Sequence, residues 1–319
     1  MIFRKQRHNH DNTGLSRSQL WERRLCTERR YLLREGREDD TYSTRKIIIL
    51  GLVHAALRLT GLYKRGLANA HQLALHELTV AIQGLPAGLE GFRILHLSDL
   101  HFSRRRPSFA EAYARALAGV AADVCCITGD FRFGHYGPSG HVLTQLPRVL
   151  DAVRIRYGTY AVLGNHDLGD LVAGLRPLGV QVLMNGGLSL PVNDATLWVG
   201  GVDDPQMFQC ESVPLALHGK PDDAFVLFLC HTPISAKEAA VAGAHLYLCG
   251  HTHAGQIRLP WWGAVETNCP GAPRSHIHGL WQQDGMTGYT SAGLGTTDLP
   301  VRFNCPPEAV VITLRRGGG

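Results

Sequence analysis

The sequence of 319 residues predicts a layered α/β domain. Short apolar runs typical of strands recur from about residue 78 to the C-terminus, and three stretches between them have the patterning of helices. Strands that alternate with helices favour a sheet covered by helices. The mean hydropathy of −0.06, with 45% hydrophobic and 18% charged residues, is that of an ordinary globular protein. These values exclude both wholesale disorder and a polytopic membrane protein.

The expected elements follow one another in a regular order. Residues 78–83 alternate apolar and polar side chains, as a half-buried strand does, and residues 309–314 form the last strand. Between residues 179 and 203, Asn-Gly-Gly and Asn-Asp turns divide two or three further strands. The other expected strands are the apolar runs of FRILHLSDLH (92–101), ADVCCITGD (122–130), GTYAVLGNHD (158–167), AFVLFLCHTP (224–233) and AHLYLCGHTH (244–253). The predicted helices cover residues 109–122, 142–155 and 167–178.

The charge distribution separates the N-terminus from the rest of the chain. The net charge of +5 lies wholly within the first 46 residues, and the remainder holds equal numbers of basic and acidic residues. We therefore expect a basic N-terminal tail over 1–46, an amphipathic helical segment over 47–77 and a globular domain over 78–319. A body without net charge argues against nucleic acid as a partner, because such binding needs a basic face.

Residues 47–63, IIILGLVHAALRLTGLY, form the longest apolar stretch. As a single helix it is about 25 Å long, short for a bilayer core, and His54, Arg58, Gly61 and Arg65 fall on one narrow polar stripe. This pattern is typical of a segment that lies in a membrane interface, and the basic tail adds attraction for anionic lipid. The alternative is a helix packed on the protein's own core. The favoured localisation is cytoplasmic, peripheral on the inner membrane.

Export is the alternative localisation. Arg29 and Arg30, followed by Tyr-Leu-Leu, resemble a twin-arginine signal, and residues 68–70 offer a cleavage site. Acidic residues between this pair and the apolar stretch, and basic residues around its end, argue against export. The eight cysteines point the same way, because none has CxxC spacing and four lie in strand-like runs, as free thiols of a reducing compartment do.

Polar side chains able to bind metal follow five of the predicted strands. These strand ends carry Asp99-Leu100-His101, Gly129-Asp130, Gly164-Asn165-His166-Asp167, His231 and Gly250-His251-Thr252-His253. Ligand sites of open α/β sheets form at the carboxyl ends of strands, so we expect these residues to meet at one edge. A single histidine after a strand is commonly a packed or surface residue, but five such strand ends together indicate a metal centre. Mixed oxygen and nitrogen donors suit Mn²⁺, Fe or Zn²⁺, and Mn²⁺ is the expected ion.

Taken in this order, D-x-H, G-D, G-N-H-D, a single His and G-H-T-H resemble the motifs of the calcineurin-like metallophosphoesterase superfamily. GHTHAGQ (250–256) and RFNCPPE (302–308) are similar to its bacterial single-domain branch. The resemblance covers residues from about 80 to 316. It implies a two-sheet sandwich flanked by helices, in four layers, with two divalent metals at the sheet edge. It makes 78–319 the catalytic domain of a metal-dependent phosphoric ester hydrolase.

The resemblance also implies a role for each motif residue. One metal is expected on Asp99, His101, Asp130 and His253, and the other on Asp130, Asn165, His231 and His251, with Asp130 bridging. His166 is expected near the leaving group as an acid or charge stabiliser, which makes His166 and Asp130 the catalytic residues. Arg132, separated from Asp130 by one residue, is the expected substrate-binding clamp, because an arginine can hold a second phosphate group.

This chemistry predicts a dinuclear-metal phosphoesterase that cleaves a phosphoester or pyrophosphate bond through a metal-bound hydroxide. The interfacial segment and basic tail favour a lipid-linked substrate such as UDP-2,3-diacylglucosamine, which some membrane-associated relatives cleave. Within the same chemistry, the alternative is a cyclic nucleotide or another soluble phosphodiester. Outside it, the alternative is a catalytically silent, metal-stabilised binding scaffold. His166 argues against a scaffold, because metal retention does not require it.

Overall fold

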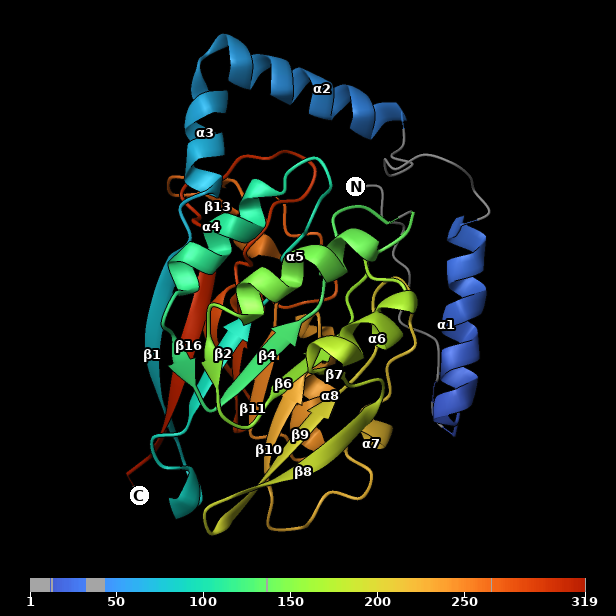
Figure 1. Ribbon diagram of the computed structural model, residues 1–319, viewed down its shortest axis with the longest axis vertical. Helices are drawn as coiled ribbons and strands as arrows, with labels where there is room; N and C mark the ends of the chain where they lie inside the picture. The colour runs from blue at the N-terminus through green and yellow to red at the C-terminus, as the bar shows by residue number, and fades with distance from the viewer. Residues whose placement is uncertain (1–11, 13, 33–43, 136, 265, 319) are drawn as a thin grey trace.

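Two six-stranded sheets form the centre of the protein, shown by a computed structural model that describes residues 12, 14–32, 44–135, 137–264 and 266–318 (Figure 1). The first sheet has the order β1 (Ala74–Ile82), β16 (Glu308–Arg316), β2 (Arg93–Leu97), β4 (Val124–Thr128), β6 (Thr159–Val162) and β7 (Val180–Val182). The second has the order β14 (Gly279–Gln283), β15 (Met286–Thr290), β11 (Leu246–Cys249), β10 (Phe225–Leu229), β9 (Ala195–Gly201) and β8 (Gly186–Val192).

The central strands of each sheet run parallel to one another. In the first sheet β2, β4, β6 and β7 are parallel, and in the second β9, β10, β11 and β15 are parallel. Antiparallel pairing is confined to β16 on β2, β14 on β15 and β8 on β9 within the two large sheets. Two small ladders lie outside them: β3 (Ala121–Ala122) with β5 (Arg154–Ile155), and β12 (Arg258–Leu259) with β13 (Gly263–Ala264). The loops after β2, β4 and β6 therefore leave one edge of the first sheet.

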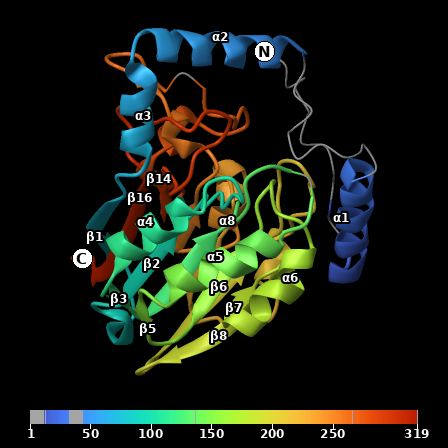
Figure 2. The ribbon, with the colours of Figure 1, turned by 45° about the horizontal axis from the view of Figure 1, so that its top comes forward.

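Helices cover the outer faces of both sheets. The α-helices of the described residues are α1 (Arg17–Leu32), α2 (Thr44–Leu59), α3 (Leu62–Ala70), α4 (Ser108–Leu117), α5 (Gly140–Leu150), α6 (Asp170–Leu175), α7 (Val213–Ala216) and α8 (Ala236–Val241), and not all of them lie on a sheet. Figures 1 and 2 show α4, α5 and α6 on the first sheet, and the apolar residues of α7 and α8 pack on the second. This gives the four layers expected from the sequence.

The strands are apolar on both faces because each sheet is covered on both sides. Ile94 of β2 packs into the core between the sheets, and the next residue, Leu95, packs against the helices on the outer face. In β10, Leu227 and Phe228 divide in the same way between the inter-sheet core and the α7–α8 layer. The period of two along a strand thus explains why the runs read as continuously apolar.

The predicted strands are confirmed, but the predicted helices end too late. Helix α4 ends at Leu117 rather than at residue 122, because Gly119 takes the left-handed conformation (φ 83°) that commonly ends a helix. Residues that the helical pattern had included then form the short ladder of β3 with β5. The hairpin of β14 and β15 was not expected, although Asp284-Gly285, with φ of 48° and 84°, is a recognisable hairpin turn.

Helix α1 lies within the basic N-terminal segment that the sequence predicts over residues 1–46. Residues 17–32 are helical, and the side chains of Arg24 and Glu28 are buried against the body. Figures 1 and 2 show α1 along the side of the molecule, beyond α6. The residues before 12 and those from 33 to 43 lie outside the described part of the chain. The division into three segments otherwise stays a prediction.

The apolar stretch 47–63 was expected to form a single helix, but the structure divides it between α2 and α3. Gly61 is left-handed (φ 73°) and separates α2 from α3, so the predicted polar stripe does not continue along one helix. Nor does α2 pack on the core: Leu52 is 66% and Leu59 is 89% exposed, and both views show α2 projecting beyond the body (Figures 1 and 2). Among the described residues, no helix combines the length and apolar character needed to cross a bilayer.

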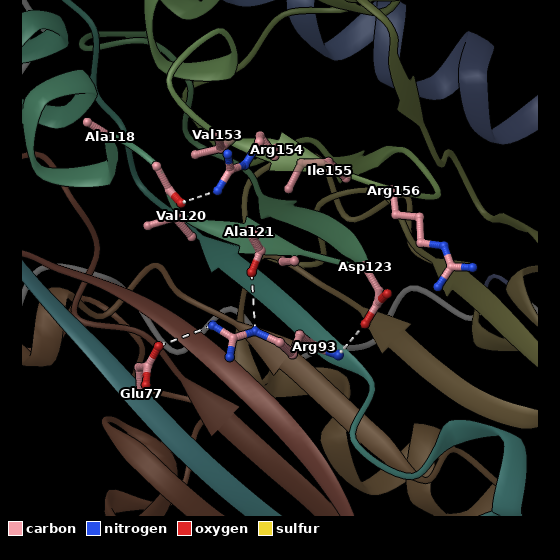
Figure 3. A pocket seen from close by; sticks show the side chains of 12 residues that line it. Glu77, Arg93, Ala118, Val120, Ala121, Asp123, Val153, Arg154, Ile155 and Arg156 are labelled. Carbon is pink, nitrogen blue, oxygen red and sulfur yellow. Dashed lines mark hydrogen bonds and ion pairs between the residues drawn. The ribbon is translucent and has the colours of Figure 1, made fainter.

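A cavity of about 1050 Å³ lies at the opposite edge of the first sheet, where β2 and β4 begin (Figure 3). Glu77, Arg93 and Asp123, which line this cavity, form hydrogen bonds with other residues that line it. Arg93 donates to the carbonyl of Ala121 and pairs with Glu77 at 3.1 Å, and its backbone N–H donates to Asp123. The strand ends that carry the predicted ligands do not line it. We therefore assign this cavity no part in the chemistry of those residues.

The layered core predicts where stability resides. Phe228 is fully buried and stacks on Tyr247 at 5.5 Å between ring centroids, so Phe228→Ala should lower the free energy of unfolding by about 3–5 kcal/mol. Leu280→Ala is the control, because Leu280 is 46% exposed on β14, and should cost under about 0.5 kcal/mol. Urea unfolding followed by circular dichroism measures both, and equal losses would contradict the layer assignment.

Candidate metal centre

Strand ends from both sheets converge on one buried site. Asp99 and His101 follow β2, Asp130 follows β4, Asn165 and His166 follow β6, His231 follows β10, and His251 and His253 follow β11. All are buried except Asn165, which is half-buried. The structure thus brings together all seven predicted metal ligands, which lie up to 154 positions apart in the sequence.

The first half of the site contains Asp99, His101 and His253. The two imidazoles face each other, with their Nε2 atoms 3.0 Å apart and their rings nearly parallel. Asp99 Oδ1 lies 3.3 Å from His253 Nε2 and 3.9 Å from His101 Nε2. These three side chains offer ligand atoms within 4.8 Å of one another.

The second half contains Asn165, His231 and His251. His231 Nε2 lies 3.0 Å from Asn165 Oδ1 and 3.1 Å from His251 Nδ1. Two of these donors are histidines from the second sheet, and the amide comes from the first, so the second half-site exists only where the sheets meet.

The Asp130 carboxylate lies between the two halves. Its Oδ2 is 3.6 Å from His101 Nε2 in the first half and 3.4 Å from His231 Nε2 in the second. Its Oδ1 accepts the backbone N–H of His166 at 2.9 Å. This position between two sets of donors is the one that a bridging ligand requires.

Backbone carbonyls hold three of the histidine rings in place. The Nδ1 of His101 lies 3.1 Å from the carbonyl of Arg132, and the Nδ1 of His231 lies 2.7 Å from that of Thr128. In His251 the Nε2 lies 3.1 Å from the carbonyl of Asn268. In a neutral imidazole, as metal binding requires, a ring nitrogen that donates to a carbonyl leaves a lone pair on the other nitrogen, and in each ring that other nitrogen points into the site.

The backbone at the ligands is left-handed, which is unusual for residues with side chains. The φ angles are 51° at Asp99, 45° at His101, 54° at Asp130, 69° at His251 and 49° at His253. Such conformations cost about 1–3 kcal/mol each and cluster at functional sites. They also explain how two residues of a D-x-H or H-x-H motif can both point inward, which an extended strand would not allow.

Glycines make room for the carboxylates. A Cβ at Gly164 would collide with Asp130 Oδ1, and one at Gly250 would collide with Asp99 Oδ2 and Ser98 Oγ. A Cβ at Gly129 would lie 2.6 Å from the backbone nitrogen of Gly164. The G-D, G-N-H-D and G-H-T-H motifs therefore need their glycines for close approach.

Burial and mutual contact set the charges of the site. Burial opposes ionisation of Asp130, but the surrounding His231, His166 and His101 outweigh it and hold the pKa of Asp130 well below its usual range. Burial likewise disfavours the imidazolium of His231, yet Asp130 raises the pKa of His231 to about 10. For His251, burial and the neighbouring His231 lower the pKa to about 4. Asp130 is thus an anion surrounded by imidazoles from both sheets.

The donor chemistry fits divalent metals. Imidazole nitrogens facing each other at 3.0 and 3.1 Å, with carboxylate oxygens beside them, form converging donors for a cation. Three His/Asp clusters occur among the described residues, and none includes a cysteine. The middle cluster shares His101 with the first and Asp130 with the third. The thiols of Cys125, Cys126 and Cys249 are buried within strands as expected, and that of Cys230 is buried directly after β10.

His166 lies beside the converging donors rather than among the two facing pairs. Its Nε2 is 3.8 Å from Asp130 Oδ2, and its Nδ1 has no hydrogen-bond partner among the described residues. Burial and the neighbouring His135 lower the pKa of His166, while Asp130 works in the opposite direction. The ring is thus held next to the predicted metal ligands, with a buried Nδ1 that has no partner among the described residues.

Sequence reasoning missed His135, which stacks on His166 with ring centroids 3.7 Å apart. Its Nδ1 lies 3.1 Å from the carbonyl of Asn165. His135 follows β4 by seven residues, outside any motif, and only its shared loop with Asp130 could have pointed to it. It fixes the rotation of the His166 ring.

Arg302, also missed, explains the RFNCPPE motif. It is fully buried and donates to the carbonyls of Ala292 and Gly293 at 2.8 and 3.0 Å, and its Nη2 lies 3.2 Å from His253 Nδ1. Cys305, in the same motif, donates to the carbonyl of His253. Two residues of the motif therefore hold His253 of the first half-site in place.

GHTHAGQ has a structural meaning as well. Residues 253–256 are all left-handed, and the buried Gln256 accepts from Thr297 N and donates to the carbonyl of Leu299. Thr252 donates to the carbonyl of Ile277 at 2.6 Å. These bonds tie the sharp turn carrying His251 and His253 to the loops around it.

Arg132 is 1% exposed, and its Nη1 donates to the carbonyl of Gly137 at 2.8 Å. Its own carbonyl faces His101 Nδ1. The predicted clamp on a second phosphate stays a prediction. Asp203 and Asp204, which the sequence analysis left out of the site, are bonded elsewhere: Asp203 pairs with Arg24, and Asp204 accepts the N–H groups of Met207 and Phe208.

Comparison with known proteins adds a family to this geometry. The family model for calcineurin-like phosphoesterases matches residues 92–255, just over half of the chain. An uncharacterized metallophosphoesterase of Bacillus subtilis, YkuE, is 28% identical over 256 residues, which cover 77% of this chain and 86% of that protein. A transmembrane protein with metallophosphoesterase domain of Bos taurus is 30% identical over 307 residues, covering 88% and 66%. The phosphodiesterase YaeI of Escherichia coli is 29% identical over 235 residues, covering 70% and 82%.

The central position of Asp130 predicts that Asp130→Asn should lose most bound metal and reduce phosphodiester hydrolysis at least about a hundredfold, because the neutral amide replaces an anion shared by both half-sites. Elemental analysis and hydrolysis of bis-p-nitrophenyl phosphate measure the two effects. Asp123→Asn is the control, because Asp123 lies in the loop at the far edge of the sheet. A fully metallated, active Asp130→Asn would contradict the arrangement.

His166 should behave differently from the ligands. Because two full sets of donors remain without it, His166→Ala should keep metal near the wild-type content while lowering turnover by about 10²–10⁴-fold, the usual contribution of a proton donor. The same two measurements test this. Loss of metal in parallel with activity would make His166 a ligand instead.

Proposed function

The chain belongs to the calcineurin-like phosphoesterase family and is a metal-dependent phosphoric ester hydrolase, and from this premise we propose that it cleaves a phosphoester or pyrophosphate bond in a lipid-linked substrate at a site holding two divalent metals. The observation that carries the two-metal proposal is the Asp130 carboxylate between two sets of histidine and oxygen donors. Asp99, His101, Asp130 and His253 would hold one ion, and Asp130, Asn165, His231 and His251 the other.

When bound, two divalent ions supply Lewis acidity toward phosphoryl oxygens and a nucleophile from water at neutral pH. The chain's own residues do the rest. Asp130 stays anionic and would be shared by the two ions, and the histidines whose other nitrogen faces a carbonyl would each turn a lone pair toward an ion. We propose that His166, which lies beside Asp130 and has a ring nitrogen without a partner among the described residues, donates a hydrogen bond or a proton to the leaving oxygen. Mn²⁺ is the ion we propose, with Fe and Zn²⁺ compatible with the same donors.

The exposed apolar surface at the N-terminal end of the domain supports a lipid-linked substrate. Residues 44–70 hold five basic residues and no acidic one. Large apolar side chains of α2 stand in solvent beside Arg58, Lys64 and Arg65. An exposed apolar helix next to cationic side chains is the composition that binds an anionic membrane surface.

The β12–β13 hairpin contributes a second exposed apolar group. Trp261 is 99% and Trp262 is 84% exposed at its tip. The hairpin lies beside α3, because Phe303 pairs with Ile257 at its base and lies against Gly66 of α3. Tryptophan is enriched at membrane–water interfaces, where its ring is part apolar and part polar. We propose that this hairpin and α2, which continues into α3, together form one membrane-binding surface, which we call the α2–hairpin surface.

The contacts of the helices on either side of α2 set how it would meet a bilayer. Before it, α1 is docked on the body through Arg24, and after it, α3 is docked through Gly66, whose carbonyl accepts the N–H of Arg302. Both flanking helices therefore lie on the same side of any membrane that α2 contacts. We propose that α2 lies in the interface plane and that the protein is peripheral on the cytoplasmic face of the inner membrane.

The second candidate is hydrolysis of a soluble phosphodiester, favoured by the Escherichia coli relative that is named a phosphodiesterase. The two candidates differ in the leaving group and not in the metal chemistry. A single experiment addresses the class first: metal analysis of purified protein together with hydrolysis of bis-p-nitrophenyl phosphate in Mn²⁺. About two metals per chain with turnover that falls in His166→Ala supports the proposal, and metal without turnover supports a binding scaffold.

A screen then separates the substrates. We expect faster hydrolysis of UDP-2,3-diacylglucosamine in mixed micelles than of cyclic nucleotides at equal concentration. A preference for the cyclic nucleotides would favour the soluble phosphodiesterase instead.

The α2–hairpin surface predicts membrane binding that depends on its apolar side chains. Trp261→Ser with Trp262→Ser, or Leu52→Ser with Leu59→Ser, should reduce sedimentation with phosphatidylglycerol vesicles about tenfold or more, because each pair removes a large buried area at the interface. Hydrolysis of bis-p-nitrophenyl phosphate should stay unchanged. Val241→Ser, at an exposed position on α8, is the control. Wild-type protein that does not sediment with these vesicles, or variants that sediment equally, would contradict the proposal.

A further inference from the structure

Helix α1 reaches the loop of His166 through one buried arginine. Arg24 is fully buried, and its guanidinium bonds to three groups on different elements. Its Nη2 donates to the carbonyl of Asp167 at 2.6 Å, its Nε to Glu28 Oε1 at 2.8 Å, and its Nη1 to Asp203 Oδ1. The guanidinium also lies over the ring of Phe208, 4.0 Å from its centroid. We propose that Arg24 is a positioning residue for His166, a role that rests on the catalytic function proposed for His166.

The contact falls on the residue that joins two site loops. The Asp167 carboxylate accepts the N–H of Gly164 at 2.9 Å within its own loop. It also accepts the N–H groups of Phe131 and Arg132, at 2.9 and 3.3 Å, in the loop that follows Asp130. Asp167 therefore fixes the His166 loop relative to the bridging carboxylate. Arg24 holds the same residue from the other side, through its backbone carbonyl.

Glu28 adds a second connection from α1 to this loop. Its Oε1 accepts the N–H of Gly169 at 2.9 Å while it accepts from Arg24. A Cβ at Gly169 would lie 2.7 Å from the ring of Trp21, so α1 lies directly against the chain that follows His166. Residues 167 to 169 are thus held by three side chains of α1.

Arginine is suited to this position for a chemical reason. Three acceptors lie around the head group in different directions, and only a planar guanidinium with five N–H donors reaches all of them at once. A lysine ammonium would keep the buried charge next to Asp203 and Glu28 but not the planar arrangement of donors. Displacing the Asp167 carbonyl would move the neighbouring His166, whereas six of the seven predicted metal ligands lie on other loops.

Arg17 provides a matched control on the same helix. Its Nε donates to the carbonyl of Asn185 at 2.7 Å and its Nη2 to that of Leu215 at 3.0 Å. It therefore docks α1 on the body without touching residues 164–169. Arg17→Met weakens docking alone, and Arg24→Met removes docking together with the contact to Asp167.

The first test follows the His166 ring directly and does not depend on activity. In full-length protein loaded with diamagnetic Zn²⁺ and carrying isotope-labelled histidine, the ring resonances of His166 are assigned from their loss in His166→Gln. Arg24→Met should shift these resonances, and Arg17→Met should leave them in place. Unchanged His166 resonances in a folded Arg24→Met, or equal shifts in Arg17→Met, would overturn the proposal. If Arg24→Met does not fold, Arg24→Lys decides by the same criterion, since it keeps the buried charge.

The second test uses the leaving group. A misplaced proton donor harms a poor leaving group more, so Arg24→Met should lower kcat for diphenyl phosphate about tenfold more than for bis-p-nitrophenyl phosphate. KM and metal content should stay near the wild-type values, and Arg24→Lys should recover part of the loss. Equal losses for both diesters, matching those of Arg17→Met, would reduce Arg24 to a docking residue. If His166→Ala lost no activity, the proposed role of His166 would fail, and the resonance experiment would still decide whether Arg24 positions the ring.

Discussion

The Asp130 carboxylate is the group on which the arrangement of the site depends. A buried anion is costly unless partners surround it, and here the partners come from both sheets: His101 and the N–H of His166 from the first, and His231 from the second. The two sheets must therefore keep a fixed register to each other along the edge where β4 and β10 end. The inter-sheet core between them supplies that register.

The geometry around Asp130 has a conformational cost that explains the motifs. Five of the seven predicted ligands have left-handed backbones, which bulky residues adopt only where the surroundings hold them. Gly129, Gly164 and Gly250 allow the loops to approach within a distance that no side chain would permit. Arg302 and Gln256 support these loops, because each donates a hydrogen bond to a backbone carbonyl of an adjoining loop. The predicted ligands, the glycines and the supporting side chains thus form one packed unit.

The N-terminal helices show how little average composition says about burial. Helix α1 is strongly polar, yet one of its charged residues, Arg24, is fully buried because Asp203, Glu28 and a carbonyl surround it. Helix α2 is more apolar in mean hydropathy than α1, yet its Leu52 and Leu59 face solvent. The polar helix α1 thus packs on the body, whereas the apolar helix α2 adds little to the core.

The sequence by itself determined the class of fold and the residues that converge at the candidate metal centre. Apolar runs ending in Asp, Asn and His are local patterns, and parallel strands bring their carboxyl ends to one edge, so the convergence of Asp99 with His253 follows from periodicity and topology. The C-terminal end of α4 was placed too late and the break between α2 and α3 was missed. In each case a single left-handed glycine, Gly119 or Gly61, ends the helical course of the chain.

Only the tertiary structure decided which residues support the site. Arg24 contacts Asp203 across 179 positions, and Arg302 reaches His253 from 49 positions away, and neither lies at a strand end. His135 stacks on His166 through a loop without a motif. Such contacts depend on how separate elements pack, and a pattern within one segment carries no information about them. For the same reason the exposure of α2 and of Trp261 could be learned only from the folded chain.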